Sequence, residues 1–302
     1  MKRVIVRLGN GLGNQLFTYA AAYTFAKKNN AKLYIDNESG FYKRNKYELH
    51  NFCISAPIAE KKDKFLGFFG KLKRKLLIKL PKLNYNKKFL IEKKNKDKLT
   101  EFDPDHLNIN FNNNLYFEGH YQSDKYYKSE IKNILKEFTF KNNIKNQSNE
   151  FIEKIKNSNS VSIHLRQNKF LLSENHRNIK KLNDDFLNNN INLIKKGIEF
   201  FDKKIENPKY FVWSNNFTEI RSLFPSSKFI LVDKNLNKDP ALDLYLMSLC
   251  KHFILSPSTM HYWGAQLSKN ENKICLSPLK IINKSGYYSF SNNKDIKADW
   301  WY

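Results

Sequence analysis

The chain has 302 residues, of which 41% are hydrophobic and 15% aromatic, and this composition predicts a globular protein with a sizeable core. No run approaches the roughly 18 consecutive apolar residues that a membrane-spanning helix needs, and a strand-like segment begins close to Met1. We therefore expect neither a transmembrane helix nor a signal peptide. Three scattered cysteines offer neither a disulfide framework nor metal-ligand spacing, which favours a cytoplasmic protein.

The net charge of +24 is unevenly distributed along the chain. Residues 61–98 contain fifteen Lys and Arg but only three acidic side chains. Such a balance has two interpretations: a lysine-rich and asparagine-rich composition of the whole genome, or an anionic partner such as a membrane surface, a substrate or a nucleic acid. The sequence contains no recognisable nucleic-acid-binding module, and its aromatic residues do not alternate with the basic ones in a stacking pattern. We expect no nucleic acid among the partners.

The first half of the chain opens with a β-α-β pattern. Residues 3–8 are rich in β-branched side chains and predict a strand, residues 16–28 have helical spacing, and residues 31–36 predict a second strand. Further along we expect a strand at 115–119 and a helix near 124–137.

The basic segment contains a predicted amphipathic helix at residues 65–80, which Pro81 would end. Its apolar side chains recur at helical spacing: Phe65, Phe68, Phe69, Leu72, Leu76 and Leu80. Lys and Arg surround this stripe. The helix would either pack on the core or lie on the surface of an anionic membrane.

A second α/β series follows a polar stretch at residues 142–149, which we take as the domain boundary. The predicted strands are at 160–165, 209–213, 228–232, 252–255 and 273–276. The predicted helices are at 184–201, 217–223, 241–249 and 259–267. Strands that alternate with helices predict a parallel sheet covered on both faces.

A glycine-rich loop joins the first strand to the first helix. It contains Gly11, Gly13 and Asn14, and free backbone N–H groups at the start of the helix would face any ligand there. The loop lacks the Lys-Ser/Thr of a P-loop and the glycine spacing of a dinucleotide site. A tight turn with no ligand is the alternative interpretation.

His164 and Arg166 end the strand at 160–165, and alternate residues of a strand point to the same face. Ligands bind at the carboxyl ends of strands in open α/β sheets, and arginine offers phosphate a fixed fork of donors. A structural ion pair is the alternative. Ser258 and Thr259 lie where a strand becomes a helix, so they could bind an anion or only cap the helix. Asp243 could likewise be only a dipole partner in the first turn of its helix.

Several segments, in this order, resemble the GDP-fucose-dependent α-1,2-fucosyltransferases of bacterial glycan assembly, glycosyltransferase family 11. The segments are 10–20 (NGLGNQLFTYA), 118–123 (EGHYQS), 210–215 (YFVWSN), 243–248 (DLYLMS) and 263–265 (WGA). The resemblance extends from residue 4 to about residue 280. It implies an α/β GT-B-like architecture with two Rossmann-like domains that face an inter-domain cleft. We expect an acceptor-side domain at 1–145 with a basic insertion at 61–98, and a GDP-sugar-binding domain at 146–302 whose final residues pack back on the first.

The resemblance also implies roles for the candidate residues. Arg166 would hold the pyrophosphate of the donor, and His164 and Asp243 would lie near the guanine. Ser258 and Thr259 would help to bind phosphate, and Asn14 would reach the donor from the facing domain. Gly11, Gly13, Ser214 and Lys169 complete the residues that we expect to contact the GDP-sugar.

The chain departs from the family pattern after Arg166, where the family reads Arg-Gly-Asp and this chain has Gln167, Asn168 and Lys169. One cation is therefore displaced along the chain and one acid is absent. His261 and Tyr262 also replace the usual Ser-Trp. These differences leave the identity of the donor open, and another GDP-linked 6-deoxyhexose or a heptose is an alternative to fucose.

The implied reaction is an inverting displacement, in which an acceptor hydroxyl attacks the anomeric carbon while GDP leaves. Arg166, backbone amides and Lys169 would stabilise the leaving diphosphate, so we expect no metal or other cofactor. Asp103-Pro-Asp105 resembles a metal-binding pattern, but we expect a Pro-centred turn there. With no acid at position 169, Glu174 is the first candidate for the general base, and an exposed loop glutamate is the alternative.

The expected acceptor is the 2-hydroxyl of a galactose-type residue in a precursor of lipopolysaccharide or capsule, carried on a glycan or a lipid-linked oligosaccharide. Such an acceptor predicts a cytoplasmic enzyme that contacts the anionic inner face of the cytoplasmic membrane. The competing classes are an inactive homologue and a non-catalytic basic membrane-binding protein. The second would make residues 61–98 the functional region and Arg166 dispensable.

Overall fold

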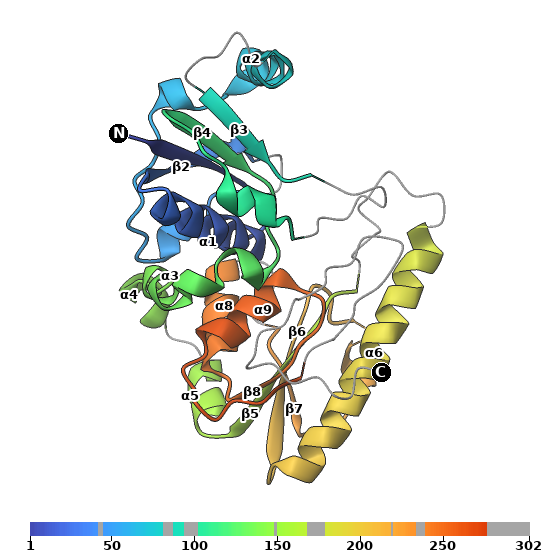
Figure 1. Cartoon of the computed structure of the whole chain (residues 1–302). Coiled ribbons are helices and arrows are strands. Elements are labelled where there is room, and N and C mark those ends of the chain that lie inside the picture. The colour runs from blue at the N-terminus through green and yellow to red at the C-terminus, as the bar shows by residue number, and fades with distance from the viewer. Residues whose placement is uncertain are drawn as a thin grey trace. The chain divides into compact units, whose positions relative to one another are not determined.

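Parallel strands form two separate sheets in the computed structural model of the chain (Figure 1). The structure describes residues 1–41, 45–80, 87–93, 102–147, 150–167, 179–218, 220–233 and 239–276. The chain divides into two compact units, Met1–Lys141 and Asn142–Tyr302. Each unit contains one sheet, so the predicted α/β class is confirmed.

The sheet of the first unit has the strand order β2-β1-β4-β3, and every neighbouring pair is parallel. The strands are β1 (Arg3–Gly9), β2 (Lys32–Gly40), β3 (Lys87–Ile91) and β4 (Asn114–Glu118). Helix α1 (Leu12–Lys28) connects β1 to β2 and is buried on nearly all sides, which explains its mixed small and aromatic composition. The order changes direction between β1 and β4, so the residues after Gly9 and Glu118 meet at one edge of the sheet.

The predicted basic helix is present as α2 (Gly67–Lys79), but the prediction placed Phe65 on the wrong element. Phe65 precedes the helix and is buried against Ile5 and Tyr116, whereas no residue of α2 itself is buried. The apolar residues of the segment therefore belong to two different environments, which helical spacing alone does not separate.

The helix predicted near 124–137 is interrupted. Two short 3-10 helices, η5 (Asp124–Tyr126) and η6 (Lys128–Glu130), precede the α-helix α3 (Ile131–Glu137). Tyr127 separates them with φ −136° and ψ 0°, outside the helical region. Its buried ring packs edge-on against Phe17 of α1, and this tertiary contact outweighs the local helical pattern.

The sheet of the second unit has the strand order β7-β6-β5-β8-β9, again with every neighbouring pair parallel. The strands are β5 (Asn159–Leu165), β6 (Pro208–Ser214), β7 (Phe229–Leu231), β8 (His252–Ile254) and β9 (Cys275–Leu276). The helices are α4 (Asn142–Lys145), α5 (Glu150–Lys156), α6 (Ile179–Lys204), α7 (Ile220–Leu223), α8 (Pro240–Leu249) and α9 (Thr259–Leu267). All five predicted strands and all four predicted helices of this half are present.

Two hydrophobic clusters cover the two faces of this second sheet, as the alternating pattern predicts. Val161, Ile163 and Leu165 of β5 pack toward α6 and α7. Phe211 and Trp213 of β6 pack on the opposite side with α5, α8 and α9. The even-numbered residues of β5 therefore face α9, and this face carries the polar residues of the candidate site. None of the described helices is long and apolar enough to span a membrane.

Candidate active site

The candidate donor site lies at the point where the strand order of the second unit changes direction. From β5 the chain passes outward to β6 and β7, then returns to the other side of β5 with β8 and β9. The segments that leave β5 and β8 therefore diverge at the carboxyl edge of the sheet. Open α/β sheets bind ligands in the crevice at such a position. His164 and Arg166 leave β5 here, and Ser256 and Ser258 leave β8.

The half-buried His164 faces the fully buried His261 of α9, with the ring centres 5.9 Å apart. The Nε2 atom of His261 lies 3.0 Å from Oγ of Ser162, and its Nδ1 atom accepts the backbone N–H of Ser256 at 3.4 Å. Because Nδ1 accepts, Nε2 carries the hydrogen and donates it to Ser162. This pair fixes the start of α9 against β5. The sequence identified His261 only as a departure from the family pattern.

Burial, followed by the charge of Arg166, lowers the pKa of His164 to about 4. Burial, followed by the proximity of His164, holds the pKa of His261 well below its usual range. Both rings are therefore neutral at physiological pH. The Nδ1 atom of His164 is buried and has no hydrogen-bond partner among the described residues. A neutral ring nitrogen in this position is suited to hydrogen-bonding a base or a sugar hydroxyl.

Arg166 is exposed just beyond β5, while the next residue, Gln167, is 3% exposed. The backbone N–H of Gln167 donates to Oδ1 of Asn215 at 2.8 Å. Ser214 donates from Oγ to the carbonyl oxygen of Leu165 at 2.8 Å, so two hydrogen bonds join the ends of β5 and β6. Ser214, a predicted contact of the donor, therefore positions the loop that carries Arg166. The amide Nε2 of Gln167 is buried and has no partner within the described part of the chain.

Two helices begin at the same edge, because helices that connect parallel strands run antiparallel to them. Asp239 caps α8 by accepting the N–H groups of Ala241 and Leu242 at 3.0 and 3.1 Å, and Asp243 lies in its first turn. Ser258 caps α9 by accepting the N–H of His261 at 3.4 Å, and Thr259 is the first residue of that helix. The predicted cap at Ser258 is confirmed. The N–H groups of this turn give the edge a partial positive charge.

The glycine loop of the first unit has the predicted strand–turn–helix form. Gly11 precedes α1 in an extended conformation and is exposed, while Gly13 is buried in the first turn. Gln15, fully buried, holds the loop by donating to the carbonyl oxygen of Asn10 and by accepting the N–H of Glu48, both at 2.9 Å.

Asn14 and Thr18 connect α1 to the loop after β4. Oδ1 of Asn14 accepts a hydrogen bond from Nε2 of Gln122, and Oγ1 of Thr18 donates to the carbonyl oxygen of Gly119 at 3.0 Å. Asn14 is therefore positioned at the carboxyl edge of this sheet, with its amide orientation set by Gln122.

An ion-pair cluster at this edge was not anticipated from the sequence. Glu118, at the end of β4, is buried and lies between two arginines. Nε of Arg74 donates to it at 2.8 Å, and Nη1 of Arg7 lies 3.5 Å from its Oε2. The acid belongs to the EGHYQS segment, but nothing in the sequence pairs it with residues 44 and 111 positions away.

The predicted turn at Asp103-Pro-Asp105 is confirmed. Asp103 accepts the backbone N–H of Asp105 at 3.0 Å and caps the 3-10 helix η4 (Pro104–Asn108). Within the described residues no group of three or more His, Cys, Asp or Glu is placed to hold a metal ion. Two predicted site residues, Lys169 and Glu174, lie outside the described residues, as do the final residues expected to pack on the first unit.

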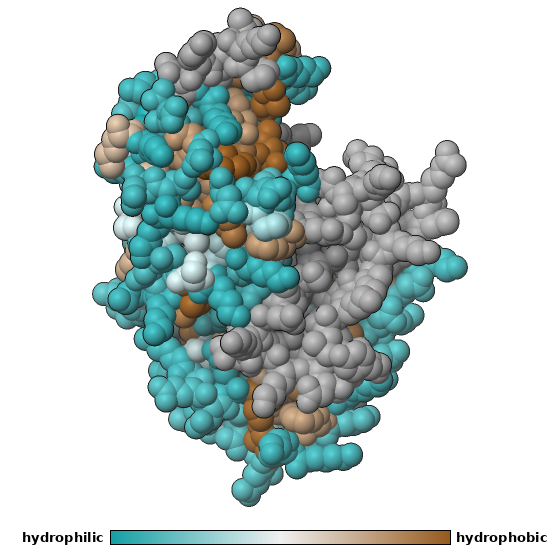
Figure 2. Space-filling model, in the orientation of Figure 1, coloured by the Kyte–Doolittle hydropathy of each residue, from teal (hydrophilic) through white to brown (hydrophobic). Residues whose placement is uncertain are grey.

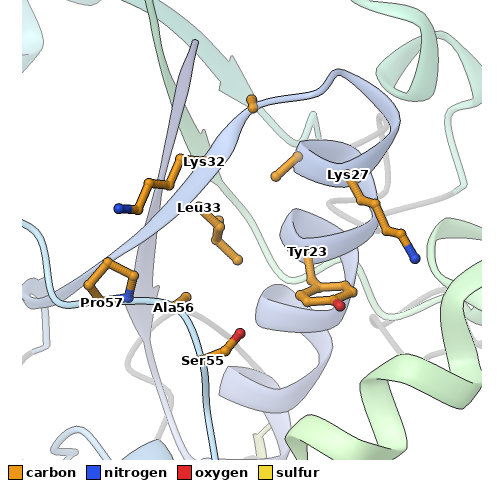
Figure 3. Close-up of a pocket in the computed structure, with 9 residues that line it drawn as sticks. Tyr23, Lys27, Lys32, Leu33, Ser55, Ala56 and Pro57 are labelled. Carbon is orange, nitrogen blue, oxygen red and sulfur yellow. The ribbon is translucent and has the colours of Figure 1, made fainter. Parts of the chain in front are cut away.

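A hollow of about 360 Å³ in the first unit lies away from these residues (Figure 3). Tyr23 and Lys27 of α1, Lys32 at the start of β2 and the 55–57 segment line it, and the two lysines point away from each other. Because Lys32 begins β2, the hollow is at the amino edge of the sheet, opposite to the glycine loop. None of the predicted site residues lines it.

Solved structures similar to this chain include fucosyltransferases studied with GDP or GDP-fucose. The NodZ alpha-1,6-fucosyltransferase soaked with GDP-fucose matches with a TM-score of 0.51 and 14% identity, over 88% of this chain and 93% of that chain. POFUT1 in complex with GDP matches with a TM-score of 0.51 and 12% identity, over 90% of this chain and 97% of that chain. The two parallel sheets therefore define a GT-B-like glycosyltransferase fold.

The chain belongs to glycosyl transferase family 11, whose model matches residues 3–302. It is 26% identical over 305 aligned positions to an alpha-1,2-colitosyltransferase of Escherichia coli, with 96% of each chain covered. It is 24% identical to the O-antigen biosynthesis glycosyltransferase WbnK of the same species, over 97% of this chain and 98% of the relative. The protein is accordingly a glycosyltransferase.

Proposed function

We propose that the protein transfers L-fucose from GDP-fucose, with inversion, to a hydroxyl of a bacterial surface-glycan precursor. The observation that carries this proposal is the convergence of His164, Arg166 and the capped start of α9 at the crevice between β5 and β8. The NodZ and POFUT1 structures, which hold GDP-fucose or GDP, support a guanine nucleotide as the carrier. Another GDP-linked deoxyhexose is the alternative donor, and the similarity to a colitosyltransferase supports it.

In the proposed reaction an acceptor oxygen forms the new bond to the anomeric carbon while the bond to the β-phosphate oxygen breaks. Arg166 and the N–H groups that begin α9 face the negative charge that develops on the departing GDP, and Lys169 adds a second cation. Because these groups supply positive charge to the leaving diphosphate, the proposed reaction needs no metal ion. Glu174 takes the acceptor proton. The 2-hydroxyl of a galactose-type residue is the proposed acceptor, carried on a lipid at the inner face of the cytoplasmic membrane.

Calorimetric titration with GDP, UDP and ADP in the presence of a metal chelator tests the donor site. We expect GDP to bind and the other two to bind more weakly. Replacement of Arg166 by Ala should weaken GDP binding by about 10- to 100-fold, the usual value of a charged hydrogen bond to phosphate. Arg221→Ala removes an exposed arginine of the same unit that pairs with Asp233, and is the matched control. Undiminished GDP affinity in Arg166→Ala would disprove the site.

The base is tested separately by Glu174→Gln. A positioned general base contributes about 100-fold or more, so turnover with GDP-fucose and a galactoside should fall by that factor while GDP affinity is unchanged. Turnover within about threefold of the wild type would remove Glu174 from the reaction. Substitution of another GDP-linked 6-deoxyhexose or of a GDP-linked heptose for GDP-fucose in the same assay identifies the preferred donor.

A further inference from the structure

Helix α2 presents an apolar face that the first unit does not cover. Phe68 and Phe69 are 76% and 82% exposed, and Leu72, Leu76 and Leu80 are also exposed. At 100° per residue the first four of these side chains fall on one side of the helix, and Leu80 directly follows its last residue. Figure 2 shows hydrophobic atoms at the part of the surface where Figure 1 places α2.

The opposite face of α2 holds the helix to its own unit. Gly70, Arg74 and Leu77 lie on this face. Arg74 pairs with the buried Glu118, Leu77 packs against the cluster around Phe65 and Tyr116, and a Cβ on Gly70 would come within 2.5 Å of the Phe65 backbone. The orientation of the helix is thereby fixed, with its apolar face directed away from the sheet.

Exposed lysines border this apolar face. Lys73 lies on one side of it and Lys75 on the other, and Lys79 lies at its C-terminal end, all exposed. Bulky apolar side chains between lysines match an anionic bilayer, in which acyl chains take up the apolar groups and the headgroups attract the cations. A second protein chain would require acidic residues to match these lysines, whereas the net charge of +24 opposes self-association through this basic surface.

We propose that α2 inserts its Phe68–Leu80 face into the surface of an anionic phospholipid bilayer and anchors the protein there. This inference rests on the proposed function, in which a lipid carries the acceptor, and it names the element that contacts the membrane. It is tested without donor or acceptor, so its failure and that of the transferase proposal are distinguishable.

The test is co-sedimentation of the full chain with vesicles of phosphatidylcholine alone and with vesicles that contain about one third phosphatidylglycerol. We expect binding to the anionic vesicles only, weakened by high salt. The double variant Phe68→Ser/Phe69→Ser should lose about tenfold or more in vesicle affinity while its GDP affinity stays that of the wild type. Ile58→Ser, which removes an exposed apolar side chain elsewhere in the same unit, is the control for apolar exposure.

The charge requirement is tested with Lys75→Glu/Lys79→Glu, and Lys132→Glu/Lys136→Glu on α3 gives the same change of net charge away from α2. Only the first pair should abolish binding. A Phe68→Trp reporter should shift its emission to the blue and be quenched by brominated lipid. No binding of the wild type to anionic vesicles would overturn the proposal, as would equal binding by the phenylalanine double variant. A dimer in light scattering that this variant dissociates would also overturn it, by assigning the face to a second copy of the chain.

Discussion

Ser162 of β5 accepts a hydrogen bond from His261 of α9 at 3.0 Å, within the interior of the second unit. Both residues are fully buried. The bond connects the strand that carries His164 and Arg166 with the helix whose first turn carries Ser258 and Thr259. The two sides of the proposed donor crevice are therefore joined by a buried hydrogen bond between two polar side chains.

Replacement of Ser162 by Ala should destabilise the second unit by about 1–3 kcal/mol, because it leaves the Nε2 hydrogen of His261 buried without an acceptor. Trp213 and Trp263 are buried in the second unit, so urea unfolding followed by tryptophan fluorescence monitors this unit. Ser226→Ala, which alters an exposed serine of the same unit, should change the unfolding free energy by less than about 0.5 kcal/mol. Equal stability of the two variants would show that the contact is not needed.

The low pKa of His164 predicts a loss of stability in acid. The unfolded chain binds a proton on this residue below its ordinary pKa of 6.5, whereas the folded chain does so only near 4. Stability is thus complete above about pH 6.5 and decreases as the pH falls toward 4, by about 3 kcal/mol from this residue. His164→Gln should lose that part of the pH dependence in the same fluorescence assay. His50→Gln, an exposed histidine of the other unit, should reproduce the wild-type curve.

The sequence predicted most of the framework because its signals are local. Hydrophobic β-branched and aromatic residues define β1, β5 and β6, and the serine before α9 defines the start of that helix. Strand β3 was missed: it begins with two lysines and lies at the edge of its sheet, so only part of it needs apolar side chains.

The site was predicted less completely, because its contacts join distant segments. The sequence motif correctly placed Arg166 at the end of β5. The hydrogen bonds that Ser214 and Asn215 make with the loop around Arg166, however, join residues about fifty positions apart. No periodicity indicates such pairs. Glu118 and Arg74 are a second case, since tertiary structure alone brings the helix to the acid.

Removal of the Arg74 side chain should loosen α2. The variant Arg74→Ala leaves Glu118 with one arginine and leaves α2 attached mainly through Leu77. We expect chymotrypsin to cleave at Phe68 and Phe69 about tenfold faster, since local opening costs less once a charged hydrogen bond is gone. Lys73→Ala removes an exposed cation from the preceding position of α2 and should leave the rate unchanged. Equal cleavage of both variants would show that the ion pair does not hold the helix.

Gly11 should be required for the ligand rather than for the fold. Its φ of −73° and ψ of 166° suit any residue, and an added Cβ would have no atom within 4 Å. Gly40 differs, because a Cβ there would lie 1.8 Å from the carbonyl oxygen of Leu8. Gly11→Ala should therefore keep the melting temperature of the wild type, while Gly40→Ala should lower it substantially.

The same variant measures how closely the donor approaches the glycine loop. If GDP-fucose contacts the backbone at the start of α1, the methyl group of Gly11→Ala should weaken its binding by about tenfold, corresponding to about 1.4 kcal/mol. Calorimetry with GDP-fucose and with GDP separates the contributions of the sugar and the nucleotide. Wild-type affinity for GDP-fucose in a fully folded Gly11→Ala protein would make the loop a structural turn, and would leave donor recognition to the residues of the second unit.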